Sequence, residues 1–341
     1  DHRDLHSFPT RRSSDLGLGS IGRRHLRNLK TLGHTDMLLY RTHQATLPDT
    51  DLSGFPTFTD LQQALAEKPD GVIVANPTAL HLEVATASAK AGAALLIEKP
   101  VSDSLLGIRE LQTALDEAGK PALVGFHLRY HPVLRQIKEL VDSNQLGKAL
   151  KAYAHWGEYL PGWHPWEDYR NSYAARADLG GGVLNTLSHP IDYLRWLMGE
   201  VRSVSASLNN LSPLELDVED NAELLLKFHS GSLATVHLDY YQRPPSHSLE
   251  ISFEKGRVRW DGASGCVVIE NAELGTIDTL CPPDGFERND MFLAEMKDFV
   301  RLCQGEQFEH CTLADGKRVQ KIVEVSRQSS SQSGCSVQLP S

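Results

Sequence analysis

Lys99 occupies a position from which a charged side chain can meet a ligand. It follows the apolar run 93–97, within the sequence Glu98-Lys99-Pro100. Such a run is typical of a strand buried in a parallel sheet, and ligands bind beyond the carboxyl ends of these strands. An amine in that crevice can hold a substrate hydroxyl. It can also assist removal of the hydroxyl proton, because partial desolvation lowers the pKa of the amine. The alternative is a solvated surface lysine.

A glycine turn, Gly17-Leu-Gly19-Ser-Ile-Gly22, provides a second candidate site. This spacing allows a tight turn, close approach of the backbone to a pyrophosphate, and a helix start whose free N–H groups bind phosphate. We therefore expect a dinucleotide to be held by residues of this turn, namely Gly17, Gly19, Ser20, Ile21 and Gly22. The alternative is a glycine turn at the surface.

Arg41 stands about 20 residues after the turn, where an acidic residue would bind the ribose hydroxyls of NAD. An arginine there suits a 2′-phosphate, which slightly favours NADP over NAD. Alternatively, Arg41 stacks on adenine or is solvated.

Other polar residues follow the predicted strand 71–75. Asn76 and Thr78 flank Pro77 and can cap the next helix, which would be a purely structural role. Their place at the ligand-binding edge equally predicts contact with the dinucleotide. The complete set of expected cofactor contacts beyond the glycine turn is Arg41, Asn76, Thr78, His81, Glu98 and Lys99.

A third candidate site is the segment 180–192, which starts with three glycines. Pro190 requires that a helix begins nearby, so His189 lies in or near its first turn. His189 and Asp192 are three residues apart and share one helix face. His189 can exchange a proton with a substrate hydroxyl while Asp192 orients it, or the pair is a helix cap with no catalytic role.

The elements that position these residues follow from hydrophobic patterning. Up to about residue 126, strands alternate with helices, which predicts a doubly wound parallel sheet with right-handed crossovers. The expected strands are 37–40, 71–75, 93–97 and 121–125, and the expected helices are 20–32, 61–66, 80–90 and 104–118.

The pattern changes after residue 127. Short, partly alternating runs predict an antiparallel sheet, at 149–155, 203–208, 222–228, 233–240, 248–253, 257–260 and 266–270. Helices are expected at 132–143, 291–303 and 313–326, with a low-complexity connector at 329–333. The sequence thus predicts a dinucleotide-binding domain at 17–126 and an α+β domain at 127–341.

Residues 1–16 are not expected to belong to this fold. They occupy the place of the strand that should precede the glycine turn, but their proline, arginines, serines and aspartates are unsuited to a central strand. The string 6–16 looks like a translated sequencing adapter, so we expect it to replace a native start. Several independent reads of the locus with the same codons would contradict this.

Composition narrows the classes of function. The 341 residues carry a net charge of -10, which argues against nucleic acid or anionic membranes as the main partner. No run approaches the roughly 20 apolar residues of a membrane span, and no signal-peptide pattern is evident, so the cytoplasm is expected. Five cysteines without CxxC spacing predict neither disulfides nor structural zinc, and without an HExxH motif no metal is expected.

With its glycine turn, Asn76-Pro77-Thr78, Glu98-Lys99-Pro100, Arg129-Tyr130-His131-Pro132 and segment 180–192, the chain resembles the Gfo/Idh/MocA family. The resemblance implies a Rossmann domain, a second α+β domain whose large open antiparallel sheet often mediates oligomers, and NAD(P)-dependent oxidation or reduction of sugars and cyclitols. We therefore expect a homo-oligomer, a dimer or tetramer, and a sugar-like substrate.

The resemblance also suggests residue roles. It makes Lys99 the catalytic or substrate-holding lysine and His189 the acid/base. Many relatives have an aspartate shortly before the histidine, where this chain has Asn185 or Thr186. The aromatic loop 156–170 looks like a substrate lid, or packs on itself or on a partner subunit. The expected substrate contacts are Arg129, Trp163, Tyr169, Asn185, Thr186 and Asp192.

Two other functions remain open from the sequence. Some members of the family are NAD-dependent glycosidases, which oxidise the substrate transiently and would retain the cofactor tightly. The absence of the aspartate also allows a non-catalytic NAD(P)-binding sensor.

Overall fold

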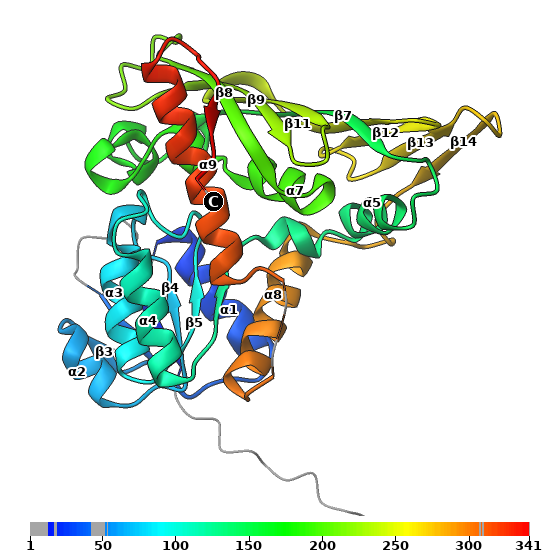
Figure 1. The fold of residues 1–341 in the computed structure, drawn as a ribbon. Helices are drawn as coiled ribbons and strands as arrows, with labels where there is room; N and C mark the ends of the chain where they lie inside the picture. The colour runs from blue at the N-terminus through cyan, green and yellow to red at the C-terminus, as the bar shows by residue number, and fades with distance from the viewer. Residues whose placement is uncertain are drawn as a thin grey trace, which may run out of the picture.

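A computed structural model describes residues 19–41, 52, 54–306, 308 and 310–340, together with the backbone of 13–16. Figure 1 shows a parallel-sheet domain below and a domain built on one wide sheet above, with helix α9 running between them. Gly17, expected at the dinucleotide, lies outside the described residues. In the described chain no helix is long and apolar enough to cross a membrane.

The first domain is the predicted doubly wound sheet. All of its paired strands are parallel, in the order β3-β2-β1-β4-β5-β6. The strand order reverses between β1 and β4, and in such sheets the ligand crevice lies at this point. The strands are β1 (Ser13–Leu16), β2 (Met37–Tyr40), β3 (Thr57–Phe58), β4 (Gly71–Val74), β5 (Ala94–Ile97) and β6 (Ala122–Val124). The helices are α1 (Ser20–Thr31), α2 (Leu61–Ala66), α3 (His81–Lys90) and α4 (Ile108–Ala118).

Strand β1 corrects one expectation from the sequence. We expected residues 1–16 to supply no strand, yet Ser13–Leu16 pairs in parallel with both β2 and β4. The pairing uses backbone N–H and C=O groups, which every residue here carries whatever its side chain. Backbone pairing with the two neighbouring strands therefore makes this segment a strand, although its composition argues against one.

The second domain contains a nine-stranded sheet in the order β14-β13-β12-β11-β7-β10-β9-β8-β15. It is not wholly antiparallel as expected, because β7 and β10 pair in parallel. Strand β14 has no counterpart in the sequence prediction. The strands are β7 (Ala149–Tyr159), β8 (Val201–Asn209), β9 (Asn221–Phe228), β10 (Leu233–Asp239), β11 (Tyr241–Phe253), β12 (Gly256–Asp261), β13 (Val267–Asn271), β14 (Thr276–Leu280) and β15 (Val337–Gln338).

Helices cover the inner face of this sheet and connect the domains. Those that contact the sheet are α6 (Val183–Thr186), α7 (His189–Met198) and α9 (Leu313–Ser331), while α5 (Pro132–Asp142) packs against α7 and α8 (Arg288–Cys303) lies against the first domain. Helix α8 packs against α1 of the first domain, as Figure 1 shows. The N–H of Val124 at the end of β6 donates to the Cys311 carbonyl at 2.6 Å. The C-terminal segment therefore completes an edge of the first domain.

The serine-rich segment near the C-terminus is helical where a connector was expected. Helix α9 continues to Ser331. The Ser329 hydroxyl accepts from the Ala206 N–H at 2.9 Å and donates to the Cys335 carbonyl at 2.7 Å. Because the serine side chains bond to the neighbouring strand and turn, a segment of low complexity becomes part of the packed structure.

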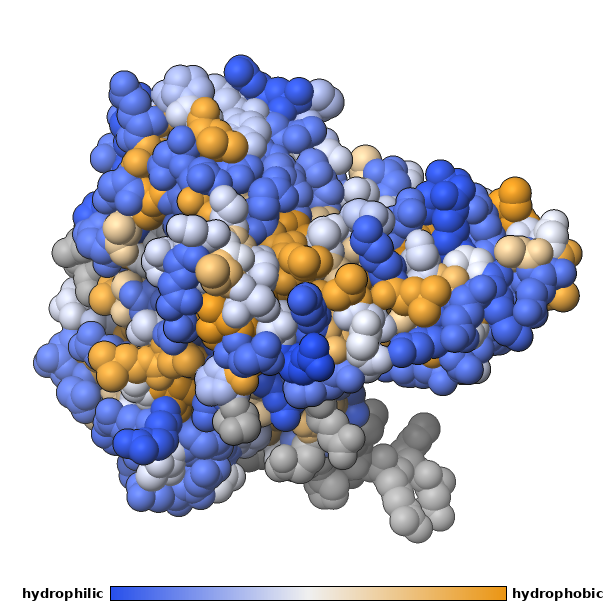
Figure 2. Space-filling view, turned by 45° about the horizontal axis from the view of Figure 1, so that its top comes forward, coloured by the Kyte–Doolittle hydropathy of each residue, from blue (hydrophilic) through white to orange (hydrophobic). Residues whose placement is uncertain are grey.

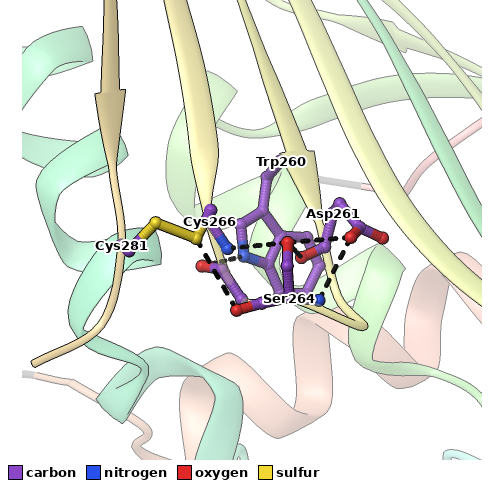
Figure 3. Close-up of a disulfide and its surroundings, with 6 residues drawn as sticks. Trp260, Asp261, Ser264, Cys266 and Cys281 are labelled. Carbon is purple, nitrogen blue, oxygen red and sulfur yellow. Dashed lines mark hydrogen bonds between the residues drawn. A yellow bond between two sulfur atoms is a disulfide. The ribbon is translucent and has the colours of Figure 1, made fainter. Parts of the chain in front are cut away.

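A disulfide joins Cys266 and Cys281, although none was expected (Figure 3). Cys266 directly precedes β13 and Cys281 directly follows β14, and the two strands pair antiparallel. The hairpin thus brings together two cysteines 15 residues apart, with their Cα atoms 4.1 Å from each other. Cysteine spacing could not reveal this because β14 was missed.

The surface agrees with the composition of the chain. Figure 2 shows a face dominated by hydrophilic residues, with small apolar areas separated from each other. Most of the buried large apolar side chains lie in one core that runs through both domains.

Candidate active site

Lys99 lies two residues beyond β5, at the carboxyl edge of the parallel sheet. Its Nζ atom donates a hydrogen bond of 2.5 Å to the backbone carbonyl of Thr186. Burial lowers the pKa of Lys99 to about 8, although the nearby Glu98 charge opposes this shift. Near neutral pH this amine can therefore both lose and regain a proton.

The carboxylate of Glu98 is held by protein groups on both oxygens. Oε1 lies 2.6 Å from His25 Nε2, and Oε2 accepts from the backbone N–H of Lys99 at 3.2 Å. Burial alone would raise the pKa of Glu98, but the His25 hydrogen bond and the Lys99 charge lower it below its ordinary value. Glu98 therefore supports the backbone at Lys99, and the expected cofactor contact stays a prediction.

His189 is the first residue of α7, as expected, and is 1% exposed. Within the described chain neither of its ring nitrogens has a hydrogen-bond partner. Its ring contacts that of His127 edge-on, with centroids 4.3 Å apart, and stacks on Trp156 at 5.6 Å. Burial, and then the charges of His127 and Lys99, hold the pKa of His189 well below its ordinary value. His189 is therefore a neutral ring with a free acceptor nitrogen.

Asp192 does not orient His189, which corrects the expectation from their spacing. Its two carboxylate oxygens accept from Arg129 at 2.9 and 2.6 Å. Arg129 also lies 3.4 Å from Asp315, which accepts from Arg195 at 2.6 Å. A bidentate arginine satisfies a buried carboxylate better than a single ring N–H can. The structure thus places Arg129 and Asp192, both expected at the substrate, in one buried ion-pair network.

Asn185 and Thr186 differ in their relation to Lys99. Asn185 Nδ2 donates to the carbonyls of Gly180 and Gly181 at 3.0 and 3.3 Å, whereas Thr186 offers its own carbonyl to Lys99. Thr186 is therefore the residue at the lysine, and neither side chain carries a negative charge.

Several buried polar atoms next to Thr186 lack partners among the described residues. They are Asn185 Oδ1, Ser188 Oγ and both ring nitrogens of His189. Buried polar groups are nearly always hydrogen-bonded, so each unsatisfied one calls for an explanation. A ligand rich in hydroxyl groups would supply the missing donors and acceptors.

The aromatic loop 156–170 packs mainly on other segments of the chain. The Tyr169 hydroxyl donates to the Leu214 carbonyl at 3.0 Å, and Arg170 lies over the Tyr169 ring. Trp163 packs edge-on against Tyr240, with a buried Nε1 that has no partner in the described chain. Tyr169 and Trp163 thus contact other segments of the same chain, at Leu214 and Tyr240, and their expected contact with the substrate stays a prediction.

The start of α1 fits a dinucleotide phosphate. Gly19 caps the helix without a side-chain hydrogen bond, and the first turn has no acidic residue. Among the described residues, nothing lies within 4 Å of a Cβ added at Gly19, so none of them fills the space in front of its backbone. The free N–H groups there suit an anion. Ser20, Ile21 and Gly22 lie in this first turn, as expected.

The remaining predicted cofactor residues also lie at strand ends. Arg41 follows β2 directly, and its N–H donates to the Phe58 carbonyl at 3.0 Å. Buried Thr78 begins a short 3-10 turn after β4. The His81 ring nitrogens lie 2.8 and 3.0 Å from the carbonyl oxygens of Asn76 and Pro100. His81 thus connects the turns that follow β4 and β5, which is a structural role.

Sequence reasoning missed four residues around Lys99 and His189. His127 follows β6, so the rule that identified Lys99 could have identified it. His25 lies three residues after Gly22, on the same helix. Trp156 was considered only as part of the aromatic loop and not beside His189, and no local signal marks the buried Glu295 of α8.

Comparisons with known proteins agree with this architecture. Residues 16–126 match the oxidoreductase family with an NAD-binding Rossmann fold, and residues 134–259 match the GFO/IDH/MocA C-terminal domain. The chain is 28% identical over 336 residues to the uncharacterized oxidoreductase YrbE of Bacillus subtilis, with 92% of each protein covered. It is also 28% identical to the myo-inositol 2-dehydrogenase of Thermotoga maritima, over 89% of this chain and 91% of that protein.

A solved structure shows the same fold. Levoglucosan dehydrogenase in complex with NADH and levoglucosan superposes with a TM-score of 0.85 at 19% identity, covering 97% of this chain and 99% of that one. The two matched domain models together span most of the chain and agree with the observed sheets. The protein is therefore an oxidoreductase of the Gfo/Idh/MocA family, with an NAD-binding Rossmann domain followed by the family's C-terminal domain.

Proposed function

We propose that this protein is an NAD(P)-dependent dehydrogenase or reductase acting on a hydroxyl or carbonyl group of a sugar, a cyclitol or a related derivative. The observation that carries the proposal is the Lys99 amine, with a pKa of about 8, beside the segment that holds His189. The nicotinamide supplies the hydride acceptor or donor when it is bound. The relatives named for inositol and levoglucosan support the substrate class.

Lys99 is the better proton carrier of the two candidate residues. A general base works best when its pKa lies near the operating pH, and Lys99 meets this condition. The pKa of His189 lies far lower, so its ring is a weak base. We therefore assign the transfer of the hydroxyl proton to Lys99. Neutral His189 holds the substrate hydroxyl by a hydrogen bond. This reverses the emphasis that the sequence placed on His189.

The hydrogen bond to Thr186 prepares Lys99 for this role. A neutral amine has two N–H bonds and one lone pair. Because one N–H is directed at the Thr186 carbonyl, the orientation of the lone pair is restricted. Asn185 Oδ1 and Ser188 Oγ are buried without a partner in the described chain, and they would bind further substrate hydroxyl groups only if the substrate displaces the groups that cover them.

The test is a substrate screen by nicotinamide absorbance with wild type, Lys99→Met and His189→Gln. Loss of general acid–base help should lower kcat about 10²- to 10⁴-fold in Lys99→Met, with cofactor affinity retained. His189→Gln should mainly raise KM. Turnover equal to wild type in both variants would contradict the assignment.

The same screen separates the two other functions. A non-catalytic sensor, which the absence of an aspartate at 185–186 favours, would bind the cofactor but turn over no polyol. An NAD-dependent glycosidase would cleave a glycoside with no net change in nicotinamide absorbance and with the cofactor tightly retained.

We further propose a preference for NADP, supported by Arg41 at the end of β2 and the lack of an acidic residue there. A guanidinium that contacts the 2′-phosphate contributes roughly 1.5–3 kcal/mol, which is about tenfold or more in affinity. Arg41→Ala should therefore raise the Kd for NADP by that factor and leave the Kd for NAD nearly unchanged. Equal effects on both cofactors would exclude this role.

We also propose that the chain is a homo-oligomer that associates through the nine-stranded sheet. In the part of the chain that the structure describes, no helix covers the outer face of this sheet, which carries the exposed Tyr153. Light scattering should give a mass of two or four chains, and a Tyr153→Lys variant should shift the distribution towards the monomer. A monomeric wild type would contradict it.

A further inference from the structure

We propose that the outer face of the nine-stranded sheet binds a divalent cation of the zinc class through His155, His237 and Asp239. Their candidate ligand atoms all lie within 4.8 Å of one another. This proposal does not rest on the oxidoreductase function proposed above, but the site lies on the sheet face through which we propose that the chain associates. A second group of this kind, His25 with Glu98 and Glu295, supports Lys99 and belongs to the site already described.

The only parallel pairing in the described part of this sheet brings the three residues together. His155 of β7 is the direct register partner of His237 of β10, so both side chains lie on one face. Their rings stack with centroids 4.7 Å apart. Asp239 lies two residues beyond His237 and therefore on the same face. Its Oδ2 lies 2.9 Å from His237 Nε2.

The groups around the ligands also have the arrangement that metal sites require. Nδ1 of His237 bonds to the carboxylate of Glu223 on β9, and Nε2 faces Asp239 Oδ2, while the ring stacks on that of His155. A carboxylate on the far nitrogen is the usual outer support of a metal-binding histidine. Asp239 Oδ1 accepts from the N–H groups of Tyr241 and Gln242 at 2.9 and 2.7 Å, which leaves Oδ2 facing the site.

A buried nitrogen with no partner among the described residues and an open space both occur at these three ligand residues. His155 Nε2 is buried and has no hydrogen-bond partner in the described chain, although the side chain of Gln242 lies beside this ring. A Cβ at Gly157 would collide with Asp239 Oδ2, so glycine gives the carboxylate its room. The site opens into a hollow of about 510 Å³, which His155, Glu223 and His237 help to line.

The donor set selects the class of cation. Two imidazole nitrogens and one carboxylate oxygen suit Zn²⁺, whereas Mg²⁺ and Ca²⁺ prefer oxygen ligands throughout. Metal binding would require the side chains, above all the stacked ring of His155, to rotate until the ligand atoms reach bond lengths of about 2.0–2.2 Å. Binding displaces the Nε2 proton of His237 to solvent, and the fourth position stays open to water or another ligand.

The test uses untagged, chelator-treated full-length protein titrated with Co²⁺, followed by Zn²⁺. Tetrahedral Co²⁺ absorbs strongly in the visible range, so wild type should show these bands at one ion per chain, and Zn²⁺ should abolish them. His155→Gln and His237→Gln should lose the bands. Glu223→Gln should weaken binding about 10- to 100-fold, as other outer-shell changes do.

His229→Gln is the matched control, because His229 is in the turn between β9 and β10, away from the cluster. It should bind Co²⁺ as wild type does. Circular dichroism of each variant without metal establishes whether the variant folds. If a histidine variant does not fold, Glu223→Gln still tests the site. A wild type without tetrahedral bands, or a folded His155→Gln that binds like wild type, would show that the cluster is only an ion-pair network.

Discussion

Nζ of Lys99 donates to the carbonyl oxygen of Thr186 at 2.5 Å, which ties the end of β5 to the segment before α7. One residue belongs to the Rossmann domain and the other to the second domain. The position of the amine therefore depends on how the domains pack, and a change at their interface should alter catalysis.

The pKa of Lys99 predicts the pH dependence of turnover. If the neutral amine takes the proton in the oxidative direction, kcat/KM should rise through about pH 8. The Lys99→Arg variant, whose guanidinium stays protonated, should have low activity, and its kcat/KM should not rise with pH in this range. A wild-type profile that stays flat from about pH 6 to about pH 9 would count against Lys99 as the base.

Lys99 should also make stability depend on pH. Its pKa is about 8 when folded and near the ordinary 10.5 when unfolded, so the unfolded chain binds more protons between these values. The contribution of Lys99 to the free energy of unfolding therefore rises with pH across this window. Lys99→Met should therefore raise the free energy of unfolding relative to wild type most strongly below pH 8. Denaturant titrations should show that this difference shrinks as the pH rises towards 10.5.

The network around Arg129 predicts a large loss of stability. Arg129→Met leaves the carboxylate of Asp192, which is 1% exposed, without its main charge partner. Removal of one partner of a buried pair costs about 3–5 kcal/mol. Lys90→Met is the control, because its ion pair with Glu110 is exposed and contributes about 0–1 kcal/mol. Urea unfolding measures both, and a raised KM with unchanged stability would instead assign Arg129 to the substrate.

Asp15 in β1 predicts a stabilising substitution. Its register partners on the neighbouring strands, Leu39 and Ile73, are fully buried. Replacement of an acidic residue between such partners by valine should raise the free energy of unfolding by about 1–3 kcal/mol. Asp278→Val in the exposed strand β14 should change it by no more than about 0.5 kcal/mol. If Asp15→Val destabilises the protein, the assignment of β1 is wrong.

The cysteines should differ in their reaction with iodoacetamide. Cys335 is exposed and free, so it should be labelled first in the native protein. Burial raises the pKa of Cys303 to about 12 and should keep it slow, because only the thiolate reacts. Cys266 and Cys281 should be labelled only after reduction. Peptide mass spectrometry distinguishes these outcomes, and labelling of Cys266 without reductant would exclude the disulfide.

Local patterns in the chain were enough to predict the parallel sheet and the position of Lys99 at its carboxyl edge. Apolar runs such as 94–97, glycine turns and helical periodicity involve only neighbouring residues, and they placed β5 and Lys99 correctly. The family resemblance, which the domain matches confirm, also depends on such short motifs.

Which distant residues meet became known only from the folded chain. Asp192 and His189 share a helix face, yet Asp192 pairs with Arg129, which lies 63 positions away. Ser13–Leu16 forms a central strand because its backbone pairs with the neighbouring strands, and β7 pairs in parallel with β10. The pairing of side chains and strands depends on contacts between remote segments, whose free energies no local pattern records, so these features could not be predicted from the amino-acid order.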